Sequence, residues 1–176
     1  MSRDNIIKRL NEIEQEKLEL LKLLDKIDNA TENKKQTYTD KNQYKLMFDG
    51  GSRGNPGLCG AGYVIYKNGK EFNKSGQIVS KNNTNNYAEY MGLLLGLHAA
   101  IKLGIKNLII EGDSQLVINQ LNGKYKCNSS NLIPLMERSK EYLSKLSNYT
   151  LNHVLRDKNS VADGLANIAM NNYNKN

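Results

Sequence analysis

The chain has 176 residues, of which 39% are hydrophobic, so it can form one globular domain of ordinary size and an appendage. No stretch is apolar enough for a transmembrane helix, and the charged N-terminus is unlike a signal peptide, so we expect a soluble cytoplasmic protein without a membrane partner. Cys59 and Cys127 have neither the spacing of a zinc site nor the number of a disulfide framework.

The charge is unevenly distributed along the chain. Residues 1–40 carry eight Lys or Arg and nine Asp or Glu, a net charge of −1. Since the whole chain carries +7, residues 41–176 carry +8. A basic domain favours a polyanionic partner such as nucleic acid, and solubility charge is an equal alternative.

The N-terminal segment is predicted to be one amphipathic helix over residues 1–28. Its apolar residues recur every seventh position, at Ile6, Ile13, Leu20 and Ile27. Because such a face is not left in water, the helix forms a coiled coil with a second copy, docks on the domain or binds a partner protein; we favour a homodimer. Residues 29–41 are polar and are predicted to be a linker to a globular domain over 42–176.

The globular domain is predicted to begin with strands and to continue with helices. Three segments have strand-like patterns and form an antiparallel meander: 44–49, 61–67 and 70–79. Later strands are expected at 107–112 and 149–155. Helices are expected over 84–103, 114–121, 132–147 and 160–172. This order predicts an α/β fold with a mixed five-stranded sheet flanked by helices.

Four acidic residues lie in settings that suggest a shared site. An apolar strand leads to Asp49 in FDGGSRGNPG, where we expect a glycine-rich loop, and Asp113 follows the strand at 107–112. If these strands are parallel neighbours, both carboxylates emerge at the same edge of the sheet. Glu89 lies one turn into an apolar helix and should face the sheet or its rim. Asp163 begins the last helix, beside apolar neighbours. An Asp-Gly-Gly taken alone is more often a solvated turn.

If these carboxylates form a cluster, the repulsion between their negative charges must be offset. Two carboxylates about 4 Å apart repel by roughly 4 kcal/mol at an effective dielectric constant of 20. Either some stay protonated or divalent cations offset the repulsion. With oxygen ligands alone, the expected metal is Mg²⁺, with Mn²⁺ as a substitute. Two such ions can activate a water and stabilise the leaving oxygen of a phosphodiester, which is nuclease chemistry.

The order and surroundings of the four acids resemble type 1 ribonuclease H (ribonuclease HI), in the form without a long basic protrusion. The motifs are FDGGSRGNPG, TNNYAEY, IEGDSQLV and RDKNSVADGLAN, and the similarity covers about residues 44–172. The resemblance implies a ribonuclease H-like catalytic domain. It also implies an endoribonuclease that cuts the RNA strand of RNA–DNA hybrids by a two-metal-ion mechanism, leaving 5′-phosphate ends.

The resemblance also implies roles for individual residues. Asp49 would bridge two Mg²⁺ ions, and Asp163 would share the ion that activates the attacking water. Glu89 and Asp113 would hold the other ion, on the leaving-group side. Contacts to ribose 2′-hydroxyls, which distinguish RNA from DNA, are assigned to Glu89 and to the backbone near Gly51 and Ser52. Contacts in the minor groove are assigned to Asn55, Asn86 and Gln115. A pocket for a phosphate of the DNA strand is assigned to Thr84 and Asn86, with Asn85 in the same stretch.

The sequence departs from the family in the segment before the last acid. Many members carry a histidine there, and residues 155–162 contain none. Arg156 is the nearest cation and is assigned an auxiliary catalytic role, with a surface ion pair to Asp157 as the alternative. Asn159 fits the family pattern four residues before Asp163, and we expect it to orient that acid. His98 and His153 are expected in the core or at its rim, not as ligands.

Two other functions stay open at this point. The first is a catalytically silent binding module of the same fold, in which the N-terminal helix recruits a partner; such a protein is free to lose acids, and all four are present. The second is a related two-metal nuclease or integrase that cuts DNA. Proofreading exonucleases of that kind place a second acid two residues after the first, where this chain has Gly51.

Overall fold

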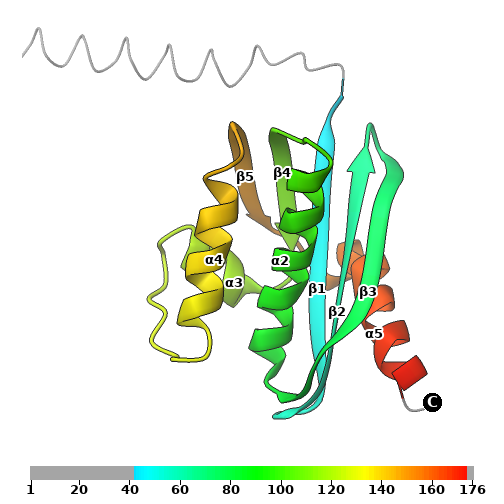
Figure 1. The fold of residues 1–176 in the computed structure, drawn as a ribbon, viewed down its shortest axis with the longest axis vertical. Helices are drawn as coiled ribbons and strands as arrows, with labels where there is room; N and C mark the ends of the chain where they lie inside the picture. The colour runs from blue at the N-terminus through cyan, green and yellow to red at the C-terminus, as the bar shows by residue number, and fades with distance from the viewer. Residues whose placement is uncertain (1–41, 174–176) are drawn as a thin grey trace, which may run out of the picture. The chain divides into compact units, whose positions relative to one another are not determined.

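The structure is a computed structural model, and it describes residues 42–173. Five strands form one sheet in the order β3-β2-β1-β4-β5 (Figure 1). Their bounds are β1 Tyr44–Gly54, β2 Gly57–Lys67, β3 Lys70–Asn83, β4 Asn107–Gly112 and β5 Asn148–His153. Strands β1, β4 and β5 are parallel, whereas β2 is antiparallel to both of its neighbours. The predicted mixed five-stranded sheet and its antiparallel meander are confirmed.

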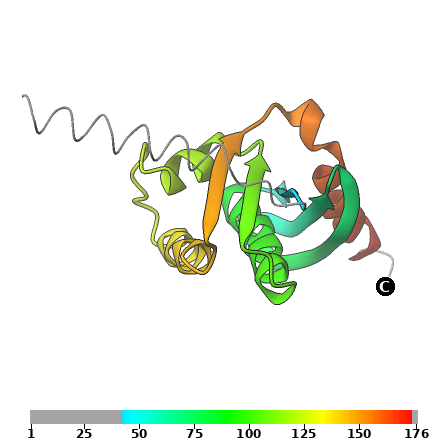
Figure 2. The same cartoon turned by 90° about the horizontal axis from the view of Figure 1, so that it is seen from above.

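Helices cover both faces of this sheet (Figures 1 and 2). Their bounds are α2 Asn85–Lys102, α3 Gln115–Leu121, α4 Ile133–Leu143 and α5 Ser160–Tyr173, with a short 3₁₀ helix, η1, at Arg156–Asn159. Helices α2 and α5 pack on opposite faces of the strands β1 and β2, and α4 lies beside α2. The chain therefore forms helical layers on either side of the sheet, as the sequence predicts.

Glycines allow both helices to approach the sheet closely. A Cβ atom at Gly50 would lie 2.0 Å from the carbonyl carbon of Ala88 in α2. A Cβ atom at Gly62 would lie 2.5 Å from the carbonyl oxygen of Ala162 in α5. Side chains alternate between the two faces of a strand, so the residues of β1 that flank Gly50 face the other layer, that of α5.

The main core lies between the sheet and α2. Its completely buried side chains include Leu46, Phe48, Leu93, Leu97 and Ile110. Full burial of each such side chain stabilises the fold by roughly 1.5–3 kcal/mol relative to exposure. The start of α2 is fixed by Thr84, whose hydroxyl accepts a hydrogen bond of 3.3 Å from the Tyr87 amide. The core thus holds the first turn of α2 against β1.

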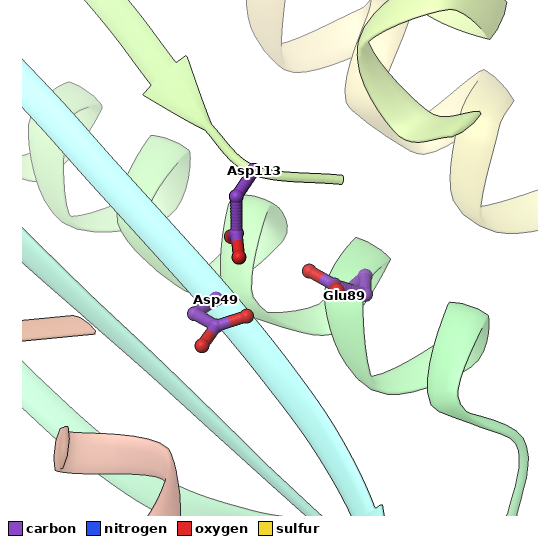
Figure 3. Close-up of side chains that lie close together, drawn as sticks. All are labelled: Asp49, Glu89 and Asp113. Atoms are coloured by element: carbon purple, nitrogen blue, oxygen red, sulfur yellow. The ribbon is translucent and has the colours of Figure 1, made fainter. Parts of the chain in front are cut away.

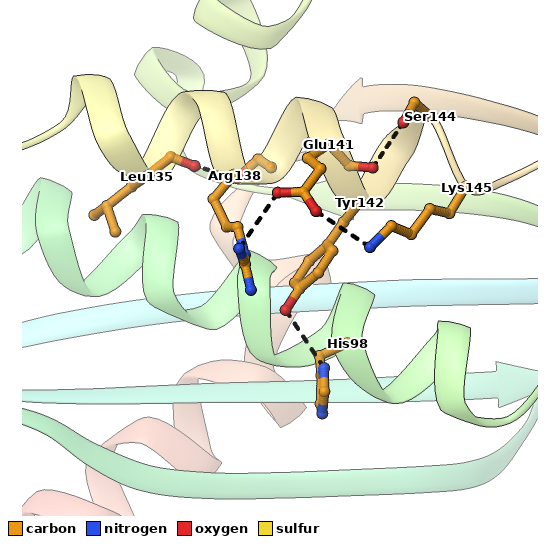
Figure 4. Close-up of polar contacts among 8 residues, drawn as sticks. His98, Leu135, Arg138, Glu141, Tyr142, Ser144 and Lys145 are labelled. Carbon is orange, nitrogen blue, oxygen red and sulfur yellow. Dashed lines mark hydrogen bonds and ion pairs between the residues drawn. The ribbon is translucent and has the colours of Figure 1, made fainter.

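A polar cluster joins α4 to α2 (Figure 4). The Tyr142 hydroxyl lies 3.5 Å from Nδ1 of His98, and the Tyr142 ring lies near the cations of Arg138 and Lys145, at 5.1 and 5.2 Å. Both cations also pair with Glu141 at 3.3 Å. Exposed pairs of this kind contribute at most about 1 kcal/mol each. His98 is exposed, and its contact with Tyr142 lies between the two helices.

Several predicted boundaries were wrong. The strand β1 does not end at Asp49 but continues to Gly54, because residues 50–54 pair with residues 57–61 of β2. Helix α4 ends at Leu143 instead of residue 147, because the chain turns there to enter β5. The segment before the last helix contains η1, which was not predicted, whereas α5 begins at Ser160 as expected.

The predicted N-terminal helix, the linker at 29–41 and the coiled-coil homodimer or partner contact fall outside the described residues and stay predictions. Within the described part of the chain, no helix is both long and apolar enough to cross a membrane.

Candidate active site

Three carboxylates meet at the edge of the sheet where β4 ends (Figure 3). The pairing of β1 with β4 ends at Phe48 and Gly112, so the next residues, Asp49 and Asp113, are neighbours beyond the last pair. Glu89 reaches them from the second turn of α2. One oxygen atom from each of the three carboxylates lies within 4.8 Å of the others. Side chains far apart in the sequence thus form a compact acidic cluster.

The close contact of α2 with β1 brings Glu89 to this position. A Cβ atom at Gly92, one turn after Glu89, would lie 2.3 Å from the carbonyl oxygen of Asp49. Only glycine permits this separation, and the helix backbone consequently lies directly against the strand. Asp49 is 5% exposed and Glu89 is 7% exposed, so both acids are largely removed from water.

The environment favours the protonated form of both buried acids. Burial, with the nearby charge of Asp113 as the next cause, raises the pKa of Asp49 from its ordinary value of 3.8 to about 7. Burial and then the charge of Asp49 raise the pKa of Glu89 from 4.5 to about 9. The Gly50 amide opposes the first shift, because it donates a 2.8 Å hydrogen bond to Asp49 Oδ1. The protein's own groups therefore do not stabilise the ionised forms of Asp49 and Glu89 as well as water does.

The cluster fits a divalent cation. Glu89 Oε2 is buried and has no hydrogen-bond partner, although an unpaired buried polar atom is costly. The three side chains present only oxygen atoms, which are the preferred ligands of Mg²⁺ and Mn²⁺. A cation at this point would offset the repulsion among the carboxylates and provide a partner for the unpaired oxygen.

The fourth acid, Asp163, lines the same pocket, which has a volume of about 200 Å³. It lies in the first turn of α5, and its charge also contributes to the raised pKa of Asp49. Arg156 donates a 2.8 Å hydrogen bond to Asp163 Oδ1, and Asn167 donates one of 3.0 Å to Oδ2. The structure thus pairs Arg156 with Asp163, and not with Asp157 as in the alternative drawn from the sequence.

Asn159 contacts a different acid from the one expected. Its side-chain nitrogen donates to Asp113 Oδ1 at 2.7 Å and to the carbonyl oxygen of Phe48 at 2.8 Å. Asn159 is 1% exposed. The prediction that it orients Asp163 was wrong because η1 turns the side chain toward β1 and β4, which the sequence spacing does not reveal.

A histidine also lies beside the cluster. His153 ends β5, where it pairs with Gly112 of β4, and its Nε2 lies 3.1 Å from the carbonyl oxygen of Asp113. The side chain is exposed and is not in the core. The sequence interpretation did not place it here, although its position near the end of the last predicted strand was a signal that could have done so.

The residues assigned to nucleic-acid contacts mostly gather where the β1–β2 hairpin meets the start of α2. The Ser52 amide donates to Asn85 Oδ1 at 3.2 Å, and the Asn85 amide donates to Asn55 Oδ1 at 3.1 Å. Of the residues assigned to nucleic-acid contacts, three line the pocket: Gly51, Ser52 and Asn85. Thr84 and Asn86 lie on either side of Asn85 at the start of α2 but do not line the pocket. Gln115 is the exposed first residue of α3 and does not line the pocket either. Part of the amide-rich run is thus engaged within the fold.

The sequence interpretation did not assign a site role to five residues that line the pocket: Gly50, Arg53, Ala166, Asn167 and Met170. Asn167 was recognisable, because it lies four residues after Asp163 on the predicted helix and therefore on the same face. Arg53 follows Asp49 by four residues, which is the same side of a strand. The prediction of a loop after Asp49 concealed that relation.

Comparisons with known proteins agree with this geometry. The family model described as reverse transcriptase-like matches residues 47–169. A curated ribonuclease HI of Halobacterium salinarum is 38% identical over 123 residues, which cover 70% of this chain. Its crystal structure superposes with a TM-score of 0.72 at 37% identity, covering 74% of this chain and 98% of that chain.

Two further proteins show the same similarity. The bifunctional protein Rv2228c of Mycobacterium tuberculosis is 38% identical over 127 residues, which cover 71% of this chain. The structure of LC11-RNase H1, in complex with an RNA/DNA hybrid, has a TM-score of 0.70 at 30% identity and covers 74% of this chain and 99% of that chain. The alignments span 62% of the length of the Halobacterium protein and 35% of that of the mycobacterial protein.

Proposed function

Since the chain belongs to the reverse-transcriptase-like family of ribonuclease H domains, we propose that it is a metal-dependent endoribonuclease that hydrolyses the RNA strand of RNA–DNA hybrids. The observation that carries this proposal is the cluster of Asp49, Glu89 and Asp113, whose oxygen atoms lie within 4.8 Å of one another in a pocket shared with Asp163. Support also comes from LC11-RNase H1, a structural neighbour solved with an RNA/DNA hybrid.

The proposed cofactor is a pair of Mg²⁺ ions, for which Mn²⁺ can substitute. Asp49 would contact both ions, Asp163 would share the ion on the side of the attacking water, and Glu89 and Asp113 would hold the other. When bound, the ions activate a water and stabilise the leaving oxygen of the phosphodiester. Displacement of the 3′ oxygen by water leaves a 5′ phosphate and a 3′ hydroxyl.

The protein's own contribution is to hold the acids in position. Asn159 donates a hydrogen bond to Asp113 and so fixes the orientation of that carboxylate. Arg156 and Asn167 each donate to one oxygen of Asp163. Preorganised groups of this kind lower the reorganisation required during the reaction. We propose Arg156 and Asn159 as auxiliary residues of the site on these contacts.

Recognition of the hybrid is proposed to lie beside the acids. The backbone at Gly51 and Ser52 lines the pocket and is suited to contact ribose 2′-hydroxyls, which distinguish RNA from DNA. Further hybrid contacts are proposed for residues of the hairpin and the helix starts: Asn55, Thr84, Asn85, Asn86 and Gln115. Proofreading exonucleases have a second acid two residues after the first, where this chain has Gly51. This difference supports the proposal over a DNA-cutting activity.

The test uses four end-labelled substrates of one sequence: the RNA–DNA hybrid, the DNA duplex, the RNA duplex and the single-stranded RNA. We expect only the RNA strand of the hybrid to be cut, with Mg²⁺ and not with EDTA. Its fragments should carry 5′ phosphates. Cutting of the DNA duplex at the same rate would indicate the DNA nuclease instead, and binding of the hybrid without cutting would indicate a silent module.

The N-terminal helix at residues 1–28 is proposed to join two copies of the chain. Sedimentation of the full chain should show a dimer, whereas a chain that begins at Asn42 should sediment as a monomer. Monomers in both cases would refute this part of the proposal.

A further inference from the structure

Arg53 provides a cation at the rim of the acid pocket. Because side chains alternate along a strand, Asp49, Gly51 and Arg53 face the same side of β1, on which α5 packs. Four residues of strand place the Cα atoms of Asp49 and Arg53 about 13 Å apart. Gly51 lies between them without a side chain, so the surface from the acids to the guanidinium has no intervening side chain of β1.

The guanidinium is held by neutral groups. Arg53 Nη1 donates to the carbonyl oxygen of Met170 at 3.4 Å, and Nη2 donates to Asn171 Oδ1. Among residues 42–173, no acidic side chain forms an ion pair with Arg53. The other arginine of the pocket, Arg156, is paired with Asp163. Arg53 is therefore the pocket arginine whose charge is available to a ligand.

This available charge has a chemical counterpart in the proposed substrate. A polynucleotide strand that places one phosphate at the acids and runs along β1 would carry further phosphates towards Arg53, which lines the same pocket. A guanidinium has five N–H donors and binds phosphate oxygens in a planar, two-pronged geometry. Two donors hold Arg53 against α5 and leave others free.

We propose that Arg53 binds a backbone phosphate of the cleaved strand, a few nucleotides from the scissile phosphate, and that Asn171 positions its guanidinium. The inference rests on the proposed function and adds a substrate contact to it. Arg53 would then contribute to binding of the strand and not to the chemical step.

The first test is the steady-state hydrolysis of a hybrid by the full chain and by Arg53→Ala over a series of salt concentrations. We expect KM to rise about fivefold with kcat nearly unchanged. The slope of log(kcat/KM) against log[salt] should become shallower by about one, because one phosphate contact is lost. The matched control is Arg138→Ala, which removes the same charge from an exposed site on α4 and should leave the slope unchanged.

A second test locates the phosphate. Single neutral methylphosphonate linkages are placed along the deoxynucleotide flanks of a DNA–RNA–DNA strand paired with DNA. One position should raise KM for the wild type and have no further effect on Arg53→Ala, whereas Asn171→Ala and Arg53→Lys should show intermediate KM values. If the wild type cuts hybrids but Arg53→Ala keeps its KM and salt slope, or no linkage is sensitive, the Arg53 inference is overturned. If the wild type cuts no hybrid, the proposed function itself fails.

Discussion

The side-chain nitrogen of Asn159 donates a 2.7 Å hydrogen bond to Oδ1 of Asp113 and thereby ties the segment before α5 to the end of β4. The same nitrogen donates to the carbonyl oxygen of Phe48 in β1, the residue before Asp49. One buried amide thus joins the middle of β1, next to Asp49, to the residue that follows β4. On these contacts we propose Asn159 as a positioning residue of the site.

Replacement of Asn159 by alanine should weaken the binding of Mg²⁺ at the active site. Because Asp113 loses the donor that orients it, we expect the Mg²⁺ concentration for half-maximal activity to rise roughly ten- to a hundredfold. The free energy of unfolding should also fall by about 1–3 kcal/mol, since the Phe48 carbonyl loses a buried partner. The control is Asn122→Ala, which removes an amide that donates to the Leu151 carbonyl and should leave the Mg²⁺ requirement unchanged. An unaltered requirement in Asn159→Ala would refute the positioning role.

Gly92→Ala should separate α2 from β1. The added Cβ would lie 2.3 Å from the carbonyl oxygen of Asp49, so the helix must shift and move Glu89 away from the cluster. We expect a loss of about 1–3 kcal/mol in the free energy of unfolding, typical of overpacking, and reduced activity. Gly164→Ala is the matched control for stability, because its Cβ meets no atom within 4 Å. Urea unfolding of both variants measures the difference, and equal stability would contradict the close contact.

The stability of the metal-free protein should fall as the pH rises. The folded-state pKa values of Asp49 and Glu89, about 7 and about 9, are above their ordinary values, so folding favours their protonated forms. Their contribution to stability is present below about pH 4 and is lost as the pH rises through those folded-state values. In EDTA, the free energy of unfolding should therefore decrease between about pH 5 and pH 9.

Mg²⁺ should restore stability at the alkaline end of this range, because it binds the ionised carboxylates of the folded state. The double variant Asp49→Asn, Glu89→Gln should show a smaller decrease in EDTA and little effect of Mg²⁺. A wild-type stability independent of pH in EDTA would show that the two acids are not held in their protonated forms.

Arg156→Ala should affect catalysis more than stability. The arginine side chain is 77% exposed, so its pair with Asp163 stabilises the fold by less than about 1 kcal/mol. Since it fixes one oxygen of a proposed metal ligand, we expect kcat to fall about tenfold and the melting temperature to stay unchanged. Arg156→Lys should recover part of kcat. Wild-type kinetics in Arg156→Ala would remove this residue from the proposed site.

Local patterns were sufficient to predict much of the fold. The apolar run Asn107–Gly112 coincides with β4, and the helix expected over 84–103 corresponds to α2 at Asn85–Lys102. The parallel relation of β1 and β4 follows from the helical crossover between them, and it places Asp49 next to Asp113.

The errors came from relations that depend on three-dimensional packing. Gly50 and Gly51 suggested a loop after Asp49, but Gly50 serves to admit the backbone of α2 beside a continuing strand. The partner of Asn159 depends on η1, whose four residues have no periodicity to recognise. Arg53 was missed because the segment after Asp49 was predicted to be a loop, and a residue in a loop cannot be assigned to one face of a strand.

We propose that the gathered carboxylates catalyse cleavage of the RNA strand in a hybrid. The most direct measurement compares the wild type with Asp113→Asn for cleavage of a labelled hybrid in Mg²⁺ and for hybrid affinity. We predict that the variant loses cleavage by several orders of magnitude while it stays folded and binds the hybrid. Cleavage by Asp113→Asn at the wild-type rate, or wild-type cleavage in EDTA at the rate seen in Mg²⁺, would show that the carboxylate cluster is not a metal-dependent catalytic centre.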